Sequence, residues 1–303
     1  MKYFKTEASR IACRYEINVL NFNSVTENKP PFTQTGDDGE IRQYGICPSC
    51  LNPVQLIGLY KRVKRSPYGK HAGKDIEGFP KWDYYKYQHC PFAKSADKKP
   101  IDFDERGIIT EDTVELYNLL KTQFDRVVYI ITKDFGIKGS SAFWENALIQ
   151  FRESEGYCYP WLTESNLPYI FAFFGLQQQR LYKQGFATGS DIYNALRKHP
   201  AVEFDDKYSK KYPRFINRKN QFADMYFRLT DHRQLAKEGD ELTESIKFCV
   251  DDRSENKTIF EKRIVFDETY FPNLIRKSDN EDKRQQWLLD ISDRLMPPLE
   301  KTE

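Results

Sequence analysis

The sequence predicts an α+β protein: a small N-terminal zinc-binding module, a helical middle region, and a C-terminal antiparallel β-sheet followed by a terminal helix. Three observations lead to this prediction. Cysteines and histidines cluster between residues 47 and 90, apolar residues recur every three or four positions from 110 to 200, and polar and apolar residues alternate after 200. Helices and strands are therefore grouped along the chain, and we expect divisions at 1–100, 101–200 and 201–303.

The composition is that of a folded protein. Of the 303 residues, 39% are hydrophobic and 15% are aromatic, so the chain has large side chains to bury in a core. The sequence contains no run of 18 apolar residues, which a membrane-spanning helix would need. The first residues also lack the uninterrupted apolar segment of a secretory signal. We therefore expect a cytoplasmic protein without a membrane partner.

The stretch "CPSC" places the thiols of Cys47 and Cys50 on one tight turn, where both can face a single cation. His71, His89 and Cys90 are the other donors nearby. Adjacent residues rarely reach the same ion, because a strand points them to opposite sides and a helix turns them apart. The preferred set is Cys47, Cys50, His71 and Cys90, while a set in which His89 replaces His71 or Cys90 stays open. A reduced pair of buried cysteines and a redox dithiol are the alternatives to a metal site.

Four protein ligands leave no coordination position for water or substrate, so a zinc ion bound there would be structural. No glutamate in an HxE or HExxH pattern follows to act as a general base. The isolated Cys13, Cys158 and Cys249 are interpreted as small buried apolar residues.

The N-terminal part is basic. Residues 1–100 contain 17 Lys and Arg against 10 Asp and Glu, a net +7, whereas the rest contains 30 against 35, a net −5. Basic residues alternate with tyrosines in the stretch between the metal donors, where Tyr60 and Trp82 add aromatic rings. Such residues neutralise phosphates and stack on unpaired bases, although a solvated charged loop has the same composition. The nucleic-acid-binding candidates are Lys61, Arg62, Lys64, Arg65, Tyr68, Lys70 and Lys74.

The middle region predicts a helix over 110–136, with Thr110 as N-cap and Gly136 near its end, and a second over 138–156. Shorter helices are expected within 166–186 and 189–200. The turn between the first two helices resembles a helix-turn-helix, but the second helix begins with "SSAFWENALIQF", which offers apolar residues where base-reading side chains should be. A helical hairpin that packs into the core is the favoured interpretation.

After Pro200 the period predicts a hairpin of two strands, 244–252 and 258–271, joined across the turn 253–257, with a third strand in 221–231. An amphipathic helix is expected over 281–296. Asp251, Asp252 and Glu255 lie at this turn and are the only residues that the sequence offers to a metal-dependent nuclease. Because they lie at a turn and no other catalytic motif is present, we lean against an enzyme. His199 precedes Pro200 at an expected helix end, where an imidazolium suits the helix dipole.

The pattern "CPSC…SPYGKH…HCPF" is similar in type to the zinc knuckles attached to bacterial nucleic-acid-handling and defence proteins. It also resembles the N-terminal Cys-x-x-Cys and His segment of competence CoiA-like proteins. It departs from that segment because only "YGKH" stands where the paired histidines of an HFxH stretch are expected. The likeness covers about 45 of 303 residues and carries over no function.

The first functional hypothesis is therefore a zinc-stabilised protein that binds or senses nucleic acid, as a component of bacterial mobile elements or phage defence (antiviral defence). The alternative is a protein–protein interaction or scaffold protein whose zinc is purely structural. The second alternative is a metal-dependent nuclease.

Overall fold

The computed structural model describes residues 1–36, 38–60, 66–94, 99, 101–236, 242–277 and 284–300. The chain forms two compact units: unit 1 comprises Met1–Asp102 and Arg233–Glu244, and unit 2 comprises Phe103–His232 and Ser245–Glu303. Helices and antiparallel sheets occur together, with a Cys/His cluster in the N-terminal region, in agreement with the predicted fold class. The division at residues 100 and 200 stays a prediction.

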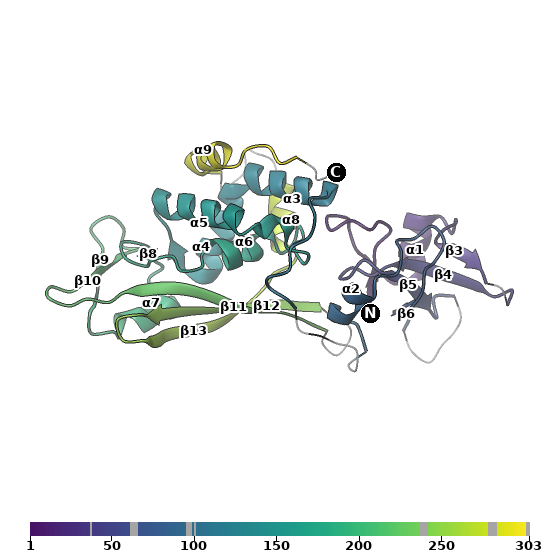
Figure 1. Cartoon of the computed structure of the whole chain (residues 1–303), viewed down its shortest axis with the longest axis horizontal. Helices are drawn as coiled ribbons and strands as arrows, with labels where there is room; N and C mark the ends of the chain where they lie inside the picture. The colour runs from purple at the N-terminus through teal and green to yellow at the C-terminus, as the bar shows by residue number, and fades with distance from the viewer. Residues whose placement is uncertain are drawn as a thin grey trace. The chain divides into compact units, whose positions relative to one another are not determined.

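Unit 1 is built on a four-stranded antiparallel sheet in the order β3-β4-β5-β6 (Figure 1). A short strand pair and two helices complete it. The elements are β1 (Tyr3–Phe4), β2 (Tyr15–Glu16), α1 (Val19–Thr26), β3 (Thr33–Thr35), β4 (Ile41–Ile46), β5 (Pro53–Ile57), β6 (Tyr68–His71) and α2 (Tyr84–His89).

The core of unit 1 contains both apolar side chains and the three clustered thiols. Phe4, Phe22 and Val54 are fully buried, and Cys47, Cys50 and Cys90 belong to the same cluster of buried residues. The thiols are therefore part of the interior of the unit.

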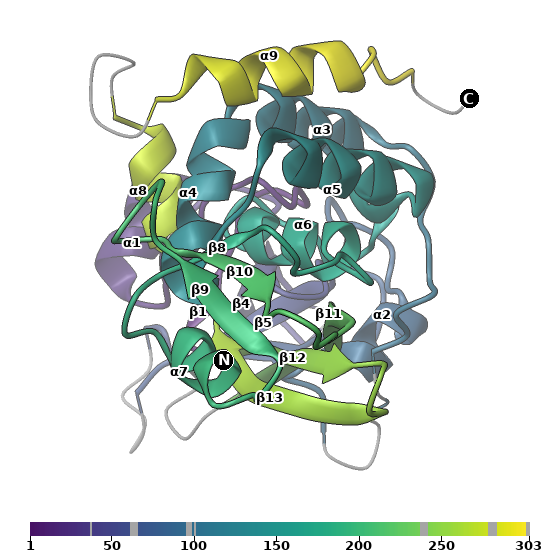
Figure 2. The same ribbon diagram turned by 90° about the vertical axis from the view of Figure 1, so that its left-hand side faces the viewer.

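Unit 2 is largely helical at one side, and its most apolar helix, α6, is buried along its whole length. Figure 2 shows α9 lying across α3 and α5. The helices are α3 (Glu111–Thr122), α4 (Phe124–Phe135), α5 (Ser141–Glu153), the 3₁₀ turn Gly156–Cys158, α6 (Leu167–Gly175), α7 (Asp191–Arg197), α8 (Tyr270–Ile275) and α9 (Gln286–Leu295). Among the described residues, none of these helices has the length and apolar character needed to cross a membrane.

The helix predicted over 110–136 is two helices, so this expectation is wrong in one respect. Thr110 caps α3 as predicted and Gly136, at φ 74°, ends α4, but Gln123 between them has φ −120° and ψ 20°. The hydroxyl of Thr122 donates to the carbonyl of Asn118 at 2.9 Å, a local bond that competes with the helical backbone. The periodic apolar residues on either side of the break are all buried, so the pattern located the core face but not the break.

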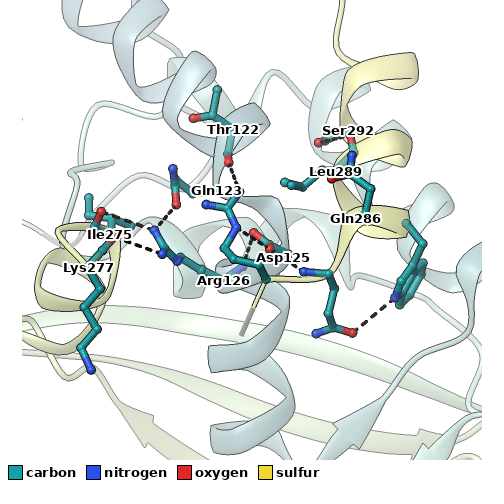
Figure 3. Close-up of polar contacts among 12 residues, drawn as sticks. Thr122, Gln123, Asp125, Arg126, Ile275, Lys277, Gln286, Leu289 and Ser292 are labelled. Carbon is teal, nitrogen blue, oxygen red and sulfur yellow. Dashed lines mark hydrogen bonds and ion pairs between the residues drawn. The ribbon is translucent and has the colours of Figure 1, made fainter. Parts of the chain in front are cut away.

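Buried polar contacts join the start of α4 to α8 and α9 (Figure 3). The carboxylate of Asp125 is fully buried and accepts from the backbone N–H of Gln285 at 2.8 Å, while Arg284 Nε lies 2.9 Å from the same oxygen. Arg126 donates to the carbonyls of Ile275 and Lys277 at the end of α8. These contacts fix both C-terminal helices against the helical core.

The strands of unit 2 form two sheets, ordered β7-β8-β10-β9 and β11-β12-β13. The predicted antiparallel hairpin is confirmed as the pair β12 and β13, but its second strand, expected over 258–271, ends at Val265, and Tyr270 and Phe271 begin α8. The third expected strand is β11. The strands are β7 (Ile137–Lys138), β8 (Gly185–Phe186), β9 (Val202–Asp205), β10 (Arg214–Asn217), β11 (Met225–Ala236), β12 (Leu242–Asp252) and β13 (Lys257–Val265).

Candidate metal centre

Two of the donors come from the tight turn that joins β4 to β5. The backbone N–H of Cys47 donates to the carbonyl of Asn52 at 2.9 Å, and that of Leu51 donates to the carbonyl of Cys47 at 3.1 Å. Leu51 takes the left-handed conformation, at φ 59°, which lets the chain reverse directly after Cys50. This reversal leaves both thiols on the inner side of the turn, where they are buried.

The other two donors are brought in by the sheet and by the end of a helix. His71 is the last residue of β6 and pairs with Val54 of β5, one residue beyond Pro53 at the end of the turn. Cys90 is the C-cap of α2, and its N–H donates to the carbonyl of Tyr87. The register of the sheet therefore brings His71 to the CPSC turn, and the C-terminal end of α2 brings Cys90 to it.

The four donor atoms lie close together. Sγ of Cys47 is 3.7 Å from Sγ of Cys90, and Nε2 of His71 is 3.3 Å from Sγ of Cys50 and 3.6 Å from Sγ of Cys90. All four atoms lie within 4.8 Å of one another. The cluster of Cys47, Cys50, His71 and Cys90 could hold a metal ion.

His89, the alternative ligand, lies outside this cluster. Its Nδ1 is 2.9 Å from the carbonyl of Tyr85, one turn earlier in α2, and its ring packs on that of Tyr85 with centroids 4.4 Å apart. The helix turns His89 away from its neighbour Cys90, which is the geometric reason that the two do not share a site.

Asn52 supports the cluster from behind. Its amide donates to Sγ of Cys50 at 3.4 Å and to the carbonyl of Asp83 at 2.9 Å, and its oxygen accepts from the N–H of Asp83 at 2.7 Å. Asp83 is the N-cap of α2, and Cys90 is its C-cap. Both ends of this helix thus contact the CPSC turn, one through the hydrogen-bonded amide of Asn52 and the other through Sγ of Cys90, which lies 3.7 Å from Sγ of Cys47.

When no cation is bound, the electrostatics of the cluster favour the ionised form of only one of the three thiols. Burial raises the pKa of Cys50 and Cys90 well above the usual value, and the neighbouring Cys47 raises the pKa of both thiols further. Burial acts in the same direction on Cys47, but hydrogen bonds from Cys50, Cys90 and His71 outweigh it and hold the pKa of Cys47 well below the usual value. A bound divalent cation would stabilise all three thiolates, so metal binding would release the protons of Cys50 and Cys90.

The predicted nucleic-acid-binding residues divide into two groups. Lys61, Arg62, Lys64 and Arg65 lie outside the described residues. Tyr68 and Lys70 are exposed on β6, two positions apart and before the donor His71, and Lys74 is exposed in the turn that follows. Tyr68 and Lys70 therefore share one face of the strand that carries a donor.

A further exposed group on α2 was not among the sequence candidates. Tyr84 and Tyr85 are 55% and 45% exposed, and Lys81 and Lys86 are exposed beside them. Tyr87 of the same helix is buried instead, with its ring 5.0 Å from that of His71. The sequence signal was present in "KWDYYKYQHC", but choosing the outward tyrosines required the helix register.

The acidic residues of the β12–β13 hairpin do not gather at one site. Asp251 pairs with Arg228 Nε and accepts from Thr258 at 2.7 Å, and the guanidinium of Arg228 holds the pKa of its carboxyl below the usual value. Asp252 lies instead beside His199, as does Glu255. Successive residues of a strand face opposite sides, so the three carboxylates cannot act as the group that the sequence suggested.

Comparisons of the chain with protein-family models, with curated proteins and with solved structures give no match.

Proposed function

We propose that Cys47, Cys50, His71 and Cys90 bind a structural zinc ion. Zinc–sulfur and zinc–nitrogen bond lengths give tetrahedral edges of about 3.8 Å between two sulfurs and about 3.5 Å between a sulfur and a nitrogen. The measured separations of 3.7, 3.3 and 3.6 Å match these edges. Three thiolates and an imidazole are soft donors that favour zinc over magnesium or calcium, and four of them leave no open position for catalysis.

Metal analysis of the purified chain tests this directly. We expect one zinc per chain in the wild type and none after His71→Ala. His89→Ala is the matched control, because it removes a buried imidazole from the adjoining helix but no donor, and it should keep the zinc. Equal zinc in the two variants, or none in the wild type, would contradict the site.

We propose further that unit 1 binds single-stranded nucleic acid through exposed tyrosines and lysines on the two elements that the metal site would join, β6 and α2. The supporting observation is the exposed group of Lys81, Tyr84, Tyr85 and Lys86, together with Tyr68 and Lys70 on β6. Tyrosine rings stack on unpaired bases, and lysines neutralise the phosphates between them.

In this proposal the metal holds the two nucleic-acid-binding elements together. It joins β6 to the C-terminal end of α2 through His71 and Cys90, which are the elements that carry the exposed tyrosines and lysines. Tyr87, Trp82 and His71 pack ring against ring between them. A fixed surface loses less conformational entropy on binding than a loose one, so zinc would raise affinity without touching the ligand.

The test is fluorescence anisotropy with a labelled single-stranded oligonucleotide at several salt concentrations. We expect affinity to fall steeply with salt and to lose roughly 0.7 of the log–log slope for each phosphate-binding lysine removed. Tyr84→Ala with Tyr85→Ala should weaken binding about tenfold or more, since each stacked base contributes about 1–3 kcal/mol. The sequence prediction is tested separately by changing Lys61, Arg62, Lys64 and Arg65 to Ala.

Tyr208→Ala is a matched control, because this tyrosine of unit 2 is also exposed and also lies beside a cation, Arg214. It should leave the affinity unchanged. Zinc must be measured in every variant, so that lost binding is not confused with a lost fold. Absent or salt-independent binding of wild-type, zinc-loaded protein would overturn the proposal and favour the scaffold alternative.

A further inference from the structure

We propose that His199, Asp252 and Glu255 of unit 2 form a second metal site, which takes a divalent first-row transition-metal ion such as Mn²⁺ and keeps coordination positions for water. This site is independent of the zinc and nucleic-acid proposals for unit 1. It differs from the nuclease interpretation of the sequence, because it includes His199 and excludes Asp251.

The three residues come from two elements that pack together. His199 follows α7, directly after its C-cap Lys198, and Asp252 ends β12, with Glu255 in the turn to β13. Figures 1 and 2 both show α7 beside β13. Successive side chains of β12 face opposite sides of the sheet, so Asp251 faces Arg228 and Asp252 faces the end of α7.

The donor atoms are spaced as ligands and not as hydrogen-bonded partners. Nε2 of His199 is 3.4 Å from Oδ2 of Asp252 and 3.7 Å from Oε1 of Glu255, and the three atoms lie within 4.8 Å of one another. Metal–nitrogen and metal–oxygen bonds of about 2.1 Å give edges of about 3.0–3.5 Å between neighbouring ligands. The two spacings fall at the upper end of this range and slightly above it.

Two of the donor atoms are buried and lack a hydrogen-bond partner among the described residues. They are Nε2 of His199 and Oδ2 of Asp252. Asp252 is fully buried, and its other oxygen accepts from Ser254 N at 2.8 Å and from Asp224 N at 3.3 Å. One oxygen is therefore fixed by the backbone, while the other faces His199 without a bond. Leaving a buried carboxylate oxygen in this state is unfavourable, and a cation would remove the cost.

The charge balance also points to a cation. Within the described part of the chain, His199 is the only basic side chain paired with Asp252 or Glu255. With a neutral imidazole the cluster carries about two negative charges, which one divalent ion neutralises. Glu255 is 50% exposed on its side chain, so the site opens to solvent on that side. Three protein ligands and an open side leave positions for water, unlike the closed cluster of unit 1.

The tautomer of His199 sets the cost of binding. Nδ1 accepts from the N–H of Ala201 at 3.3 Å, so without metal the ring proton is on Nε2 and points toward the carboxylates. Coordination through Nε2 moves that proton to Nδ1 and breaks the bond to Ala201. One imidazole and two carboxylates are borderline to hard donors, which exclude copper(I) and favour Mn²⁺, Fe²⁺ or Zn²⁺ over Ca²⁺.

The experiment titrates Mn²⁺ into the full chain after the thiol cluster has been loaded with zinc. The loss of the free Mn²⁺ signal in electron paramagnetic resonance reports the bound ion. We expect one Mn²⁺ per chain, displaced by added Zn²⁺ but not by an equal concentration of Mg²⁺. Glu255→Gln changes a half-exposed side chain, so the unit should keep its fold, and it should weaken Mn²⁺ binding roughly tenfold or more.

Asp251→Asn is the matched control, because it alters the neighbouring carboxylate that faces Arg228, and it should leave Mn²⁺ binding unchanged. Asp252→Asn keeps the shape of the side chain and should abolish binding. No Mn²⁺ bound to the wild type, equal binding by Glu255→Gln, or displacement by an equal concentration of Mg²⁺ would each overturn the proposal. The first outcome would leave a direct contact between His199 and Asp252 as the role of the cluster.

Discussion

Each unit contains a cluster of side chains that could hold a metal ion, and the two clusters differ in their relation to the fold. In unit 1 the thiols of Cys47, Cys50 and Cys90 are part of the core itself. In unit 2 the cluster of His199, Asp252 and Glu255 lies at one end of a hairpin, while the core is made of helices such as the wholly buried α6. Unit 1 would therefore depend on a metal ion for its folded core, whereas unit 2 would fold without one.

The largest expected effect is the loss of unit 1 alone. Cys47→Ser, or removal of the metal with a chelator, should unfold it, because structural zinc contributes about 10–16 kcal/mol of apparent binding free energy in zinc-finger peptides. Circular dichroism and limited proteolysis should show a protease-sensitive region 1–102 beside a protected unit 2. The interpretation of Cys13 as a buried residue is wrong, because its thiol is exposed, whereas Cys158 and Cys249 are buried as expected. Cys13→Ser, which removes this exposed thiol of the same unit, is the control. If unit 1 stayed resistant to protease after complete metal removal, its fold would not depend on the metal, and the proposed difference between the two units would be wrong.

The converse experiment weakens unit 2 and leaves the metal of unit 1 in place. Asp125→Ala removes the fully buried partner of Arg284 and the acceptor of Gln285 N, and it should cost about 3 kcal/mol. Chemical denaturation followed by fluorescence measures the change, and zinc content should stay at the wild-type value. Asp293→Ala, which removes the 81% exposed partner of Lys121, should cost less than about 1 kcal/mol. Equal losses in the two variants would contradict this account of the helical core.

A smaller effect is expected behind the thiol cluster. Asn52→Ala removes the amide that bonds Cys50 and both backbone groups of Asp83, so zinc affinity should fall about 10–100-fold. Competition with a chromophoric chelator measures this change. Ser49→Ala alters the same turn without touching a donor and should keep the wild-type affinity. An unchanged affinity in Asn52→Ala would mean that the ligands alone position α2.

The smallest effect is a dependence on pH confined to unit 2. The hydrogen bond from Arg228 lowers the pKa of the Asp251 carboxyl, so its stabilisation is present above the unfolded-state value and is lost as pH falls through the lower folded-state value. The pair is partly exposed, so we expect at most about 1 kcal/mol at pH 7. The difference in unfolding free energy between wild type and Asp251→Asn should shrink from pH 7 to pH 3. A difference that grows over that range would contradict the sign.

The donors of unit 1 could be selected from the sequence because short-range rules restrict them. The CPSC spacing fixes a tight turn, and adjacent donors such as His89 and Cys90 cannot both reach one ion, so few sets remained. The choice of Cys90 over His89 still needed the structure, since it depends on where α2 ends. The exposed tyrosines of α2 were missed for the same reason: "YYKY" predicts aromatic residues but not which of them face solvent.

The cluster of unit 2 shows the opposite case. From the sequence, Asp251, Asp252 and Glu255 were grouped as candidate nuclease residues, and His199 was interpreted as a residue at a helix end. Strand alternation in β12 separated Asp251 from Asp252, and packing between segments more than fifty residues apart brought His199 to Asp252 and Glu255. No local pattern contains that information.

The sequence by itself determined the mixture of helices and antiparallel strands, the apolar helix faces and the small set of possible thiol-cluster donors. These features depend on periodicity and on residues that are close along the chain, where backbone geometry permits few arrangements. Tertiary structure alone decided the break at Gln123, the outward face of α2 and the meeting of His199 with Asp252. Each depends on contacts between distant segments, whose register and packing are set by the whole unit.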